Sequence, residues 1–305
     1  MKVLLANPKG FCAGVRRAVE IVNKALEIYG SPLYVKHEIV HNKFVVEQLK
    51  EKGVVFVDKI EDVPEGKVVV FSAHGSAPEE YEKAKERNLT VVDATCPLVT
   101  KVHLEARRYT REGYCIILIG HKGHIEVLGT AAEGKDNVYI IETEEEAKEI
   151  KFDDGKKLAY LTQTTLSVEE TKNIIAILKK RFPEITAPPS SDICFSTTNR
   201  QMAVKEIAEK SQVVLVVGSK SSSNSNRLRE AAESVGARAY LIDGADEIEE
   251  SWLAGVETVG VTAGASAPDI SIGGVVDFLK DVGASEFEEV VSVEEKIHFP
   301  LPKIG

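Results

Sequence analysis

Short apolar runs alternate with amphipathic stretches along almost the whole chain. The runs at 68–71, 115–119 and 213–217 consist almost entirely of Val, Ile, Leu and Phe, which is typical of buried strands. Between such runs, stretches such as 13–29 carry apolar residues at the spacing of one helix face. This alternation predicts an α/β fold with parallel sheets, in which ligand groups gather in the loops after the strands.

The alternation repeats three times, and each repeat starts with a cysteine at the beginning of an amphipathic helix. These cysteines are Cys12, Cys96 and Cys194. Two polar loops follow each cysteine at similar distances; the first loops contain His41, His124 and Ser222, and the second contain His74, Thr164 and Ser266. Polar loops follow strands in any α/β protein, but the fold class does not account for one cysteine per repeat. Three units of one design are the simplest explanation.

The repeat predicts three α/β domains and a C-terminal tail. The predicted domains are 1–95, 96–192 and 193–281, each with one of the three cysteines, and the tail is 282–305. We expect the tail to pack back on the body of the protein.

The three repeated cysteines differ from the fourth, Cys115, which lies in an apolar run and is expected in the core. Three cysteines in loops are poorly explained by disulfides, and a nucleophilic enzyme needs only one. Three thiolates around a pseudo-threefold axis suit an iron–sulfur cluster with one iron free of protein, or a three-cysteine zinc site. The spacing does not choose between them.

The polar loops offer imidazole, hydroxyl and amide donors without a cluster of lysine or arginine, a set that suits a phosphate or diphosphate. Ser222, Ser223 and Asn224 also precede a predicted helix, whose N-terminus favours an anion. Plain N-capping is the common role of such residues, and a single loop histidine is usually structural. Three histidines in matched loops favour a binding role.

Glu126 lies close to His124 in the first polar loop of the second repeat. At a closed site this carboxyl would deliver protons. An exposed carboxylate at a helix start is the ordinary alternative.

Composition narrows the class of protein. A hydrophobic content of 43% supports a large core, and a net charge of −10 argues against a general nucleic-acid binder, so we expect a small ligand. No apolar run reaches the roughly 18 residues of a membrane span, and no basic-then-apolar leader begins the chain. We therefore expect a cytoplasmic protein that binds no membrane.

A set of short motifs resembles the motifs of a known family. The motifs are 7–15 (NPKGFCAGV), 37–42 (HEIVHN), 71–75 (FSAHG), 93–97 (DATCP), 120–124 (GHKGH), 162–167 (TQTTLS), 192–194 (DIC), 197–201 (TTNRQ), 218–220 (GSK), 222–228 (SSNSNRL) and 262–268 (TAGASAP). Together they resemble the 4-hydroxy-3-methylbut-2-enyl diphosphate reductases, which catalyse the last step of the non-mevalonate isoprenoid pathway. The resemblance runs from residue 2 to about residue 280.

The resemblance implies a trefoil of three α/β domains around a central [4Fe–4S] cluster held by Cys12, Cys96 and Cys194. One iron has no protein ligand and takes the hydroxyl oxygen of the substrate. Two electrons from an external donor, of the ferredoxin or flavodoxin type, remove that hydroxyl as water. The products are isopentenyl and dimethylallyl diphosphate.

The resemblance also implies roles for the polar loops. The residues expected to bind the diphosphate substrate are His41, His74, His124, Thr164, Ser222, Ser223, Asn224 and Ser266. Glu126 is expected to supply protons, which Thr164 would relay and His124 would help to deliver. Ile125 stands where the family usually has proline, and Ser221 where asparagine is common. Neither is a site position, but Ile125 leaves the backbone before Glu126 freer than proline would.

Two other classes of function use the same three cysteines. One is a metal-dependent hydrolase or dehydratase, and the other is a non-catalytic iron–sulfur sensor.

Overall fold

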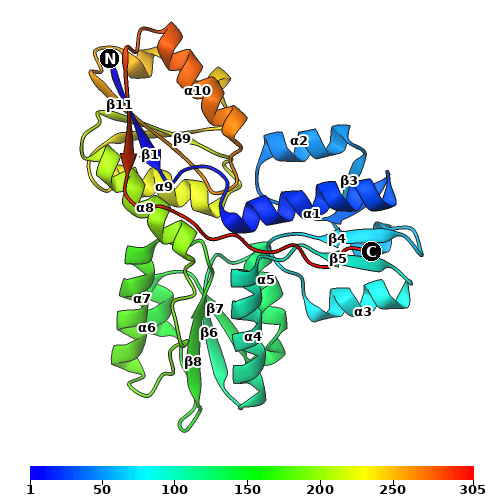
Figure 1. Cartoon of the computed structure of the whole chain (residues 1–305). Helices are drawn as coiled ribbons and strands as arrows, with labels where there is room; N and C mark the ends of the chain where they lie inside the picture. The colour runs from blue at the N-terminus through cyan, green and yellow to red at the C-terminus, as the bar shows by residue number, and fades with distance from the viewer. The chain divides into compact units, whose positions relative to one another are not determined.

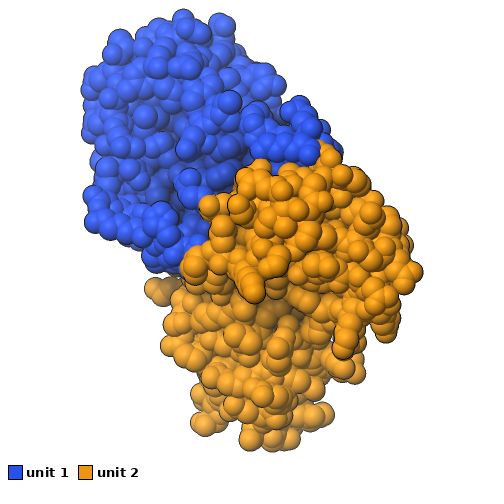
Figure 2. Space-filling view, turned by 45° about the vertical axis from the view of Figure 1, so that its right-hand side comes forward, with its two compact units in different colours: residues 1–16, 40–52, 195–299 blue, residues 17–39, 53–194, 300–305 orange.

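The computed structural model describes residues 1–305, which form two compact units (Figure 2). Unit 1 comprises residues 1–16, 40–52 and 195–299, and unit 2 comprises residues 17–39, 53–194 and 300–305. Unit 1 contains one parallel sheet, and unit 2 contains two. The predicted α/β class with parallel sheets is confirmed.

The sheet of unit 1 has five strands in the order β10-β9-β11-β1-β12. The strands are β1 (Lys2–Asn7), β9 (Val213–Val217), β10 (Arg238–Ile242), β11 (Thr258–Ala263) and β12 (Glu286–Val291). The helices of unit 1 are α2 (Lys43–Glu51), α8 (Phe195–Ala208), α9 (Ser223–Glu233) and α10 (Asp269–Asp281), with short 3-10 turns η3 (Ala245–Glu247) and η4 (Glu250–Leu253).

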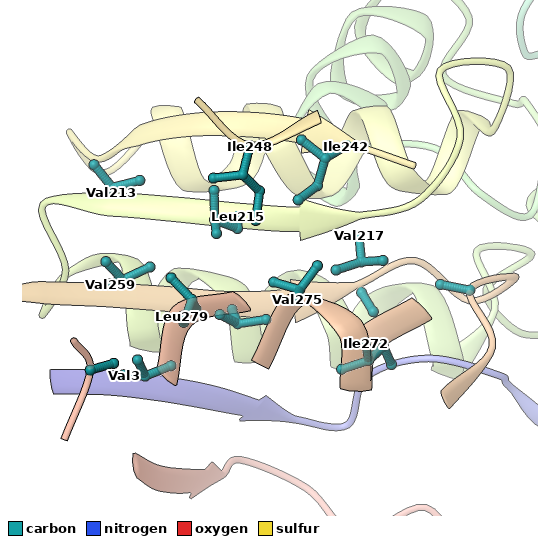
Figure 3. Packing of buried hydrophobic residues seen from close by; sticks show 14 of the residues in the cluster. Val3, Val213, Leu215, Val217, Ile242, Ile248, Val259, Ile272, Val275 and Leu279 are labelled. Atoms are coloured by element: carbon teal, nitrogen blue, oxygen red, sulfur yellow. The ribbon is translucent and has the colours of Figure 1, made fainter. Parts of the chain in front are cut away.

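Helices cover both faces of β9, an interior strand of this sheet. On one face, Val213, Leu215 and Val217 of β9 pack with Val275 and Leu279 of α10 (Figure 3). The intervening residues of β9 point to the opposite face, where they pack against α8 and α9 (Figure 1). Burial on both faces explains why β9 is an uninterrupted apolar run.

Unit 2 contains a four-stranded sheet in the order β3-β2-β4-β5 and a three-stranded sheet in the order β7-β6-β8. Its strands are β2 (Leu33–Lys36), β3 (Val54–Val57), β4 (Val68–Phe71), β5 (Thr90–Asp93), β6 (Cys115–Ile119), β7 (Val138–Ile141) and β8 (Leu158–Thr162). Its helices are α3 (Pro78–Glu86), α4 (Pro97–Arg111), α5 (Ile125–Ala132), α6 (Glu144–Glu149) and α7 (Val168–Arg181), with 3-10 turns η1 (Ile60–Asp62) and η2 (Lys135–Asn137). Helix α1 (Ala13–Tyr29) begins in unit 1 and continues in unit 2.

The local sequence accounts for where many helices begin. Asn42, Thr143, Ser167 and Ser222 each accept a hydrogen bond from a backbone N–H in the first turn of the following helix, as N-cap residues do. Helices α3 and α4 begin with proline, which has no N–H to leave unpaired at that position.

The sheets differ from the predicted segments at both ends of the chain. Strand β1 pairs with β11 and β12 rather than with the strands of residues 33–93. Strand β12 lies within the segment that we expected to be a tail; it is an edge strand rich in glutamate, so its apolar pattern is weak. The domain boundaries themselves stay predictions.

No helix combines the length and the apolar character that crossing a membrane requires. The cytoplasmic location stays a prediction.

Candidate active site

Each of the three repeated cysteines lies at the N-terminus of a helix. Cys12 and Cys194 directly precede α1 and α8, and Cys96 is the N-cap residue of α4. All three are partly exposed and free of disulfides, whereas Cys115 is buried in β6, as predicted. The backbone N–H of Val15 donates to Cys12 Sγ at 3.4 Å. Each of these cysteines therefore lies beside the backbone N–H groups of a helix start.

The three cysteine loops make the same backbone contact. The amides of Cys12, Cys96 and Cys194 donate to the carbonyls of Ala265, Ala73 and Thr164 at 3.1, 3.0 and 3.1 Å. Each accepting carbonyl belongs to the loop after a buried strand, namely β11, β4 and β8. Each cysteine is therefore attached to the second polar loop of the preceding repeat, beside Ser266, His74 or Thr164. For Cys12, in the first repeat, the accepting loop at Ala265 belongs to the third repeat.

Glu126 and Thr164 form a buried pair in unit 2. The backbone N–H of Thr164 donates to Glu126 Oε1 at 2.6 Å, and the Thr164 hydroxyl lies 3.0 Å from Oε2. Both residues are only 4% exposed. Glu126 thus lies at a helix start but is not solvated, which contradicts the ordinary alternative. Ile125 is the first residue of α5, so this placement of the carboxyl does not need proline there.

The surroundings of Glu126 shift the pKa of its carboxyl toward neutral pH. Burial raises the pKa of Glu126 to about 7, although the hydrogen bonds from Thr164 oppose this by stabilising the charged form. A carboxyl with such a pKa is protonated in a large fraction of molecules at pH 7, as a general acid requires.

Two histidines lie close to this pair. His124 is the N-cap residue of α5, and its Nδ1 accepts a hydrogen bond from the Glu126 N–H at 3.2 Å. In a neutral imidazole the hydrogen is then on Nε2, which acts as a donor. The ring of His74 meets that of His124 edge-on at 6.0 Å between centroids, and Ser72 Oγ lies 3.2 Å from His74 Nδ1.

In unit 1, two predicted substrate-binding residues are joined directly. The Ser266 hydroxyl donates to the carbonyl of His41 at 2.9 Å. Ser266 follows Ala265, whose carbonyl accepts from the amide of Cys12. The structure therefore brings Cys12, His41 and Ser266 together.

The N-terminus of α9 carries buried polar atoms that lack partners. Ser222 caps the helix, but Ser223 Oγ and both side-chain polar atoms of Asn224 have no hydrogen-bond partner. The helix start packs closely against the residues that follow β9 and β11, since a Cβ at Gly218 or at Gly264 would collide with Ser225 Oγ. Buried polar atoms without partners are costly, and here they lie in the first turn of a helix, where the helix dipole favours an anion.

The predicted residues divide between the two units. Unit 2 holds Cys96, Cys194, His74, His124, Glu126 and Thr164, and unit 1 holds Cys12, His41, Ser222, Ser223, Asn224 and Ser266. No group of three or more His, Cys, Asp or Glu side chains is placed to hold a metal ion. That the three cysteines share one metal site stays a prediction.

Sequence reasoning assigned no role to Arg200 and Glu295. Arg200 is 1% exposed, and its guanidinium donates to both carboxylate oxygens of Glu295 and to the carbonyl of Gly10 in the Cys12 loop. A signal was present in the motif at 197–201, where an arginine stands in the first turns of a helix. Its partners lie too far away along the chain to be read from the sequence.

These features define a parallel α/β protein that has three cysteines at helix starts, a buried carboxyl and a helix N-terminus with unpartnered polar side-chain atoms. Comparison with known proteins gives the family. The LytB protein family model matches residues 3–280. The 4-hydroxy-3-methylbut-2-enyl diphosphate reductase of Streptomyces coelicolor is 53% identical over 99% of this chain and 90% of the relative. That of Hahella chejuensis is 54% identical over 99% and 97%.

Solved structures agree with this relationship. The E-1-hydroxy-2-methyl-but-2-enyl-4-diphosphate reductase of Plasmodium falciparum superposes with a TM-score of 0.96 at 38% identity, covering 99% of this chain and 95% of that one. A structure of (E)-4-hydroxy-3-methyl-but-2-enyl diphosphate reductase gives a TM-score of 0.65 at 33% identity, covering 92% and 100%. The chain belongs to the LytB family, and the resemblance seen in the sequence motifs is confirmed.

Proposed function

We propose that this protein is a 4-hydroxy-3-methylbut-2-enyl diphosphate reductase of the non-mevalonate isoprenoid pathway. It removes the allylic hydroxyl of its substrate as water and yields isopentenyl and dimethylallyl diphosphate. The observation that carries the proposal is identity of 53% over 99% of the chain to a protein of that name. The reaction consumes two electrons and two protons; one proton leaves in the water and the other forms the new C–H bond.

Cys12, Cys96 and Cys194 would hold a [4Fe–4S] cluster in which one iron has no protein ligand. The donor set fits, because three partly exposed thiols lie at helix N-termini and none is in a disulfide. The N–H of Val15, which donates to Cys12 Sγ, is the kind of contact that stabilises a sulfur ligand. When bound, the cluster supplies the two electrons and a Lewis acid for the hydroxyl oxygen.

The diphosphate is held by neutral donors. Ser223 and Asn224 carry buried polar atoms without partners in the first turn of α9, and Ser222 and the helix dipole add to them. His41 and Ser266 in unit 1, and His74, His124 and Thr164 in unit 2, complete the set. Hydroxyl, amide and imidazole groups bind the anion by hydrogen bonds without adding a fixed positive charge.

Glu126 supplies protons through Thr164. With a pKa of about 7, the carboxyl keeps a proton on Oε2, which lies 3.0 Å from the Thr164 hydroxyl. That hydroxyl accepts one proton and donates its own. His124, whose Nδ1 accepts from the Glu126 amide, orients the start of α5 while its Nε2 donates to the substrate.

Anaerobic turnover tests the function directly. The purified protein is incubated with the hydroxylated diphosphate, with and without a reductant, and products are identified by mass spectrometry. The reductase forms isopentenyl and dimethylallyl diphosphate only with reductant. A three-cysteine hydrolase or dehydratase would turn the substrate over without reductant, and an iron–sulfur sensor would leave it unchanged; either result refutes the proposal.

The electrons come from an external protein donor of the ferredoxin or flavodoxin type, in the cytoplasm. Replacing the chemical reductant by each purified donor in turn identifies which one supports turnover. Failure of both donors, with dithionite active, would exclude this class of partner.

A further inference from the structure

A basic side chain holds the loop of each cysteine. Arg17 Nη1 donates to the carbonyl of Thr95, directly before Cys96, at 3.0 Å. Lys101 Nζ donates to the carbonyls of Ser190 and Ser191, shortly before Cys194, at 3.0 and 3.1 Å. Arg200 Nη2 donates to the carbonyl of Gly10, shortly before Cys12, at 2.9 Å. Each of these contacts lies within one unit.

The three cations occupy matching positions on the cysteine helices. Arg17 is in the second turn of α1, Lys101 in the second turn of α4, and Arg200 in the second turn of α8. None of them binds the loop that precedes its own helix, although Arg200 Nη1 also donates to the carbonyl of Ser196 in the first turn of α8 at 3.0 Å. The Cys12 helix holds the Cys96 loop, the Cys96 helix holds the Cys194 loop, and the Cys194 helix holds the Cys12 loop. The contacts therefore close a cycle.

Further partners hold the cations themselves in position. Arg17 Nε donates to the carbonyl of Pro300 at 2.9 Å. Lys101 pairs with the buried carboxylate of Asp192 at 2.9 Å, and Arg200 pairs with Glu295 at 3.0 Å. Residues of the C-terminal segment thus support two of the three contacts. Hydrogen bonds with a charged donor are about twice as strong as neutral ones, so these contacts restrict the loops effectively.

We propose that Arg17, Lys101 and Arg200 are positioning residues, each of which fixes the cysteine loop of the next repeat for binding of the iron–sulfur cluster. Because the cations act across repeats, loss of one contact loosens the cysteine of the next repeat and leaves the cysteine of its own helix in place. This role deepens the proposed function and depends on the cysteines being the cluster ligands.

The decisive experiment compares Arg17→Gln and Lys101→Gln with controls on the same helices. Lys24→Gln on α1 and Arg111→Gln on α4 remove an exposed charge that contacts no cysteine loop. Amide hydrogen exchange is measured by mass spectrometry, and iron release to a chelator is followed in the reconstituted protein. Arg200→Gln would leave the carboxylate of Glu295 without its cation inside unit 1 and would destabilise the fold. The test therefore uses the variants of Arg17 and Lys101.

We expect Arg17→Gln to speed exchange at 93–97 but not at 9–14, and Lys101→Gln to speed exchange at 189–194 but not at 93–97. Iron release should accelerate about tenfold or more in both variants, as for a lost hydrogen bond from a charged donor, and Arg17→Lys and Lys101→Arg should restore most of it. Exchange that is unchanged in the next loop, or iron release equal to that of the controls, would overturn the proposal.

The exchange pattern is measurable with or without iron. A wild-type protein that takes up no iron and sulfide would refute the proposed cofactor, while the exchange pattern would still decide whether the cations hold the loops.

Discussion

Replacing Glu126 by glutamine tests the central element of the proposed chemistry, a buried carboxyl that keeps its proton at neutral pH. Glutamine has the same size, its carbonyl accepts from the Thr164 N–H, and its amide donates to the Thr164 hydroxyl, so the contacts of Glu126 are retained. The substitution removes only the ability to ionise and to give a proton.

The structure sets the expected effect on stability. The pKa of Glu126 is about 7 in the folded chain against an ordinary 4.5. Between these values the folded chain binds more protons than the unfolded chain, so the free energy of unfolding falls as pH rises. The contribution is fully present below about pH 4.5 and lost above about pH 7, about 3 kcal/mol in all. Glutamine does not titrate, so the free energy of unfolding of the variant rises by this amount relative to that of the wild type as pH rises from about 4.5 to about 7.

Urea unfolding of the iron-free protein from pH 4.5 to 8 measures this difference, with Glu145→Gln, an exposed residue of α6, as the control. In the reconstituted enzyme, turnover of Glu126→Gln should fall at least about a hundredfold with iron content unchanged. Wild-type turnover should decline above pH 7 as Glu126 loses its proton, and the variant should lack that decline.

Two results would refute the reasoning. A stability difference between wild type and Glu126→Gln that stays constant with pH would mean that the carboxyl is not protonated in the fold. Near-normal turnover with full iron would mean that another group, such as the diphosphate of the substrate, gives the proton.

Three further predictions follow from the site. Replacing Cys12, Cys96 or Cys194 by serine should abolish iron binding, measured by iron and sulfide analysis, and turnover. Cys115→Ser should keep both, with a modest loss of packing stability. Asn224→Ala or Ser266→Ala should weaken substrate binding by roughly ten- to a hundredfold, measured by calorimetry, because hydrogen bonds to a charged group are worth about 1.5–3 kcal/mol. Gly264→Ala should weaken binding too, and lower the melting temperature, because the new Cβ would collide with Ser225 Oγ.

Each of these has a contrary outcome. Loss of iron in Cys115→Ser together with retention in one of the other three would contradict the repeat. Unchanged affinity in both Asn224→Ala and Ser266→Ala would remove the diphosphate from these loops. A Gly264→Ala protein with normal melting and affinity would show that α9 has room to move.

Local signals in the sequence were enough to predict many of the helices and strands. The apolar runs at 68–71, 115–119 and 213–217 are strands, and the stretch 13–29 is helix α1. Side-chain periodicity depends only on neighbouring residues, so one chain reveals it. The three cysteines were placed at helix starts for the same reason, and Cys115 in the core.

Burial and partnership were decided by the fold. Glu126 is bonded to a residue 38 positions away, and Arg200 holds a carbonyl 190 positions away; no local pattern marks either contact. The same holds for β1, which pairs with β11 and β12 because hydrogen bonding between strands joins distant segments. The sequence therefore pointed to the residue types that we propose for the chemistry. The packing of remote segments set the pKa of Glu126 and determined which loop each cation contacts.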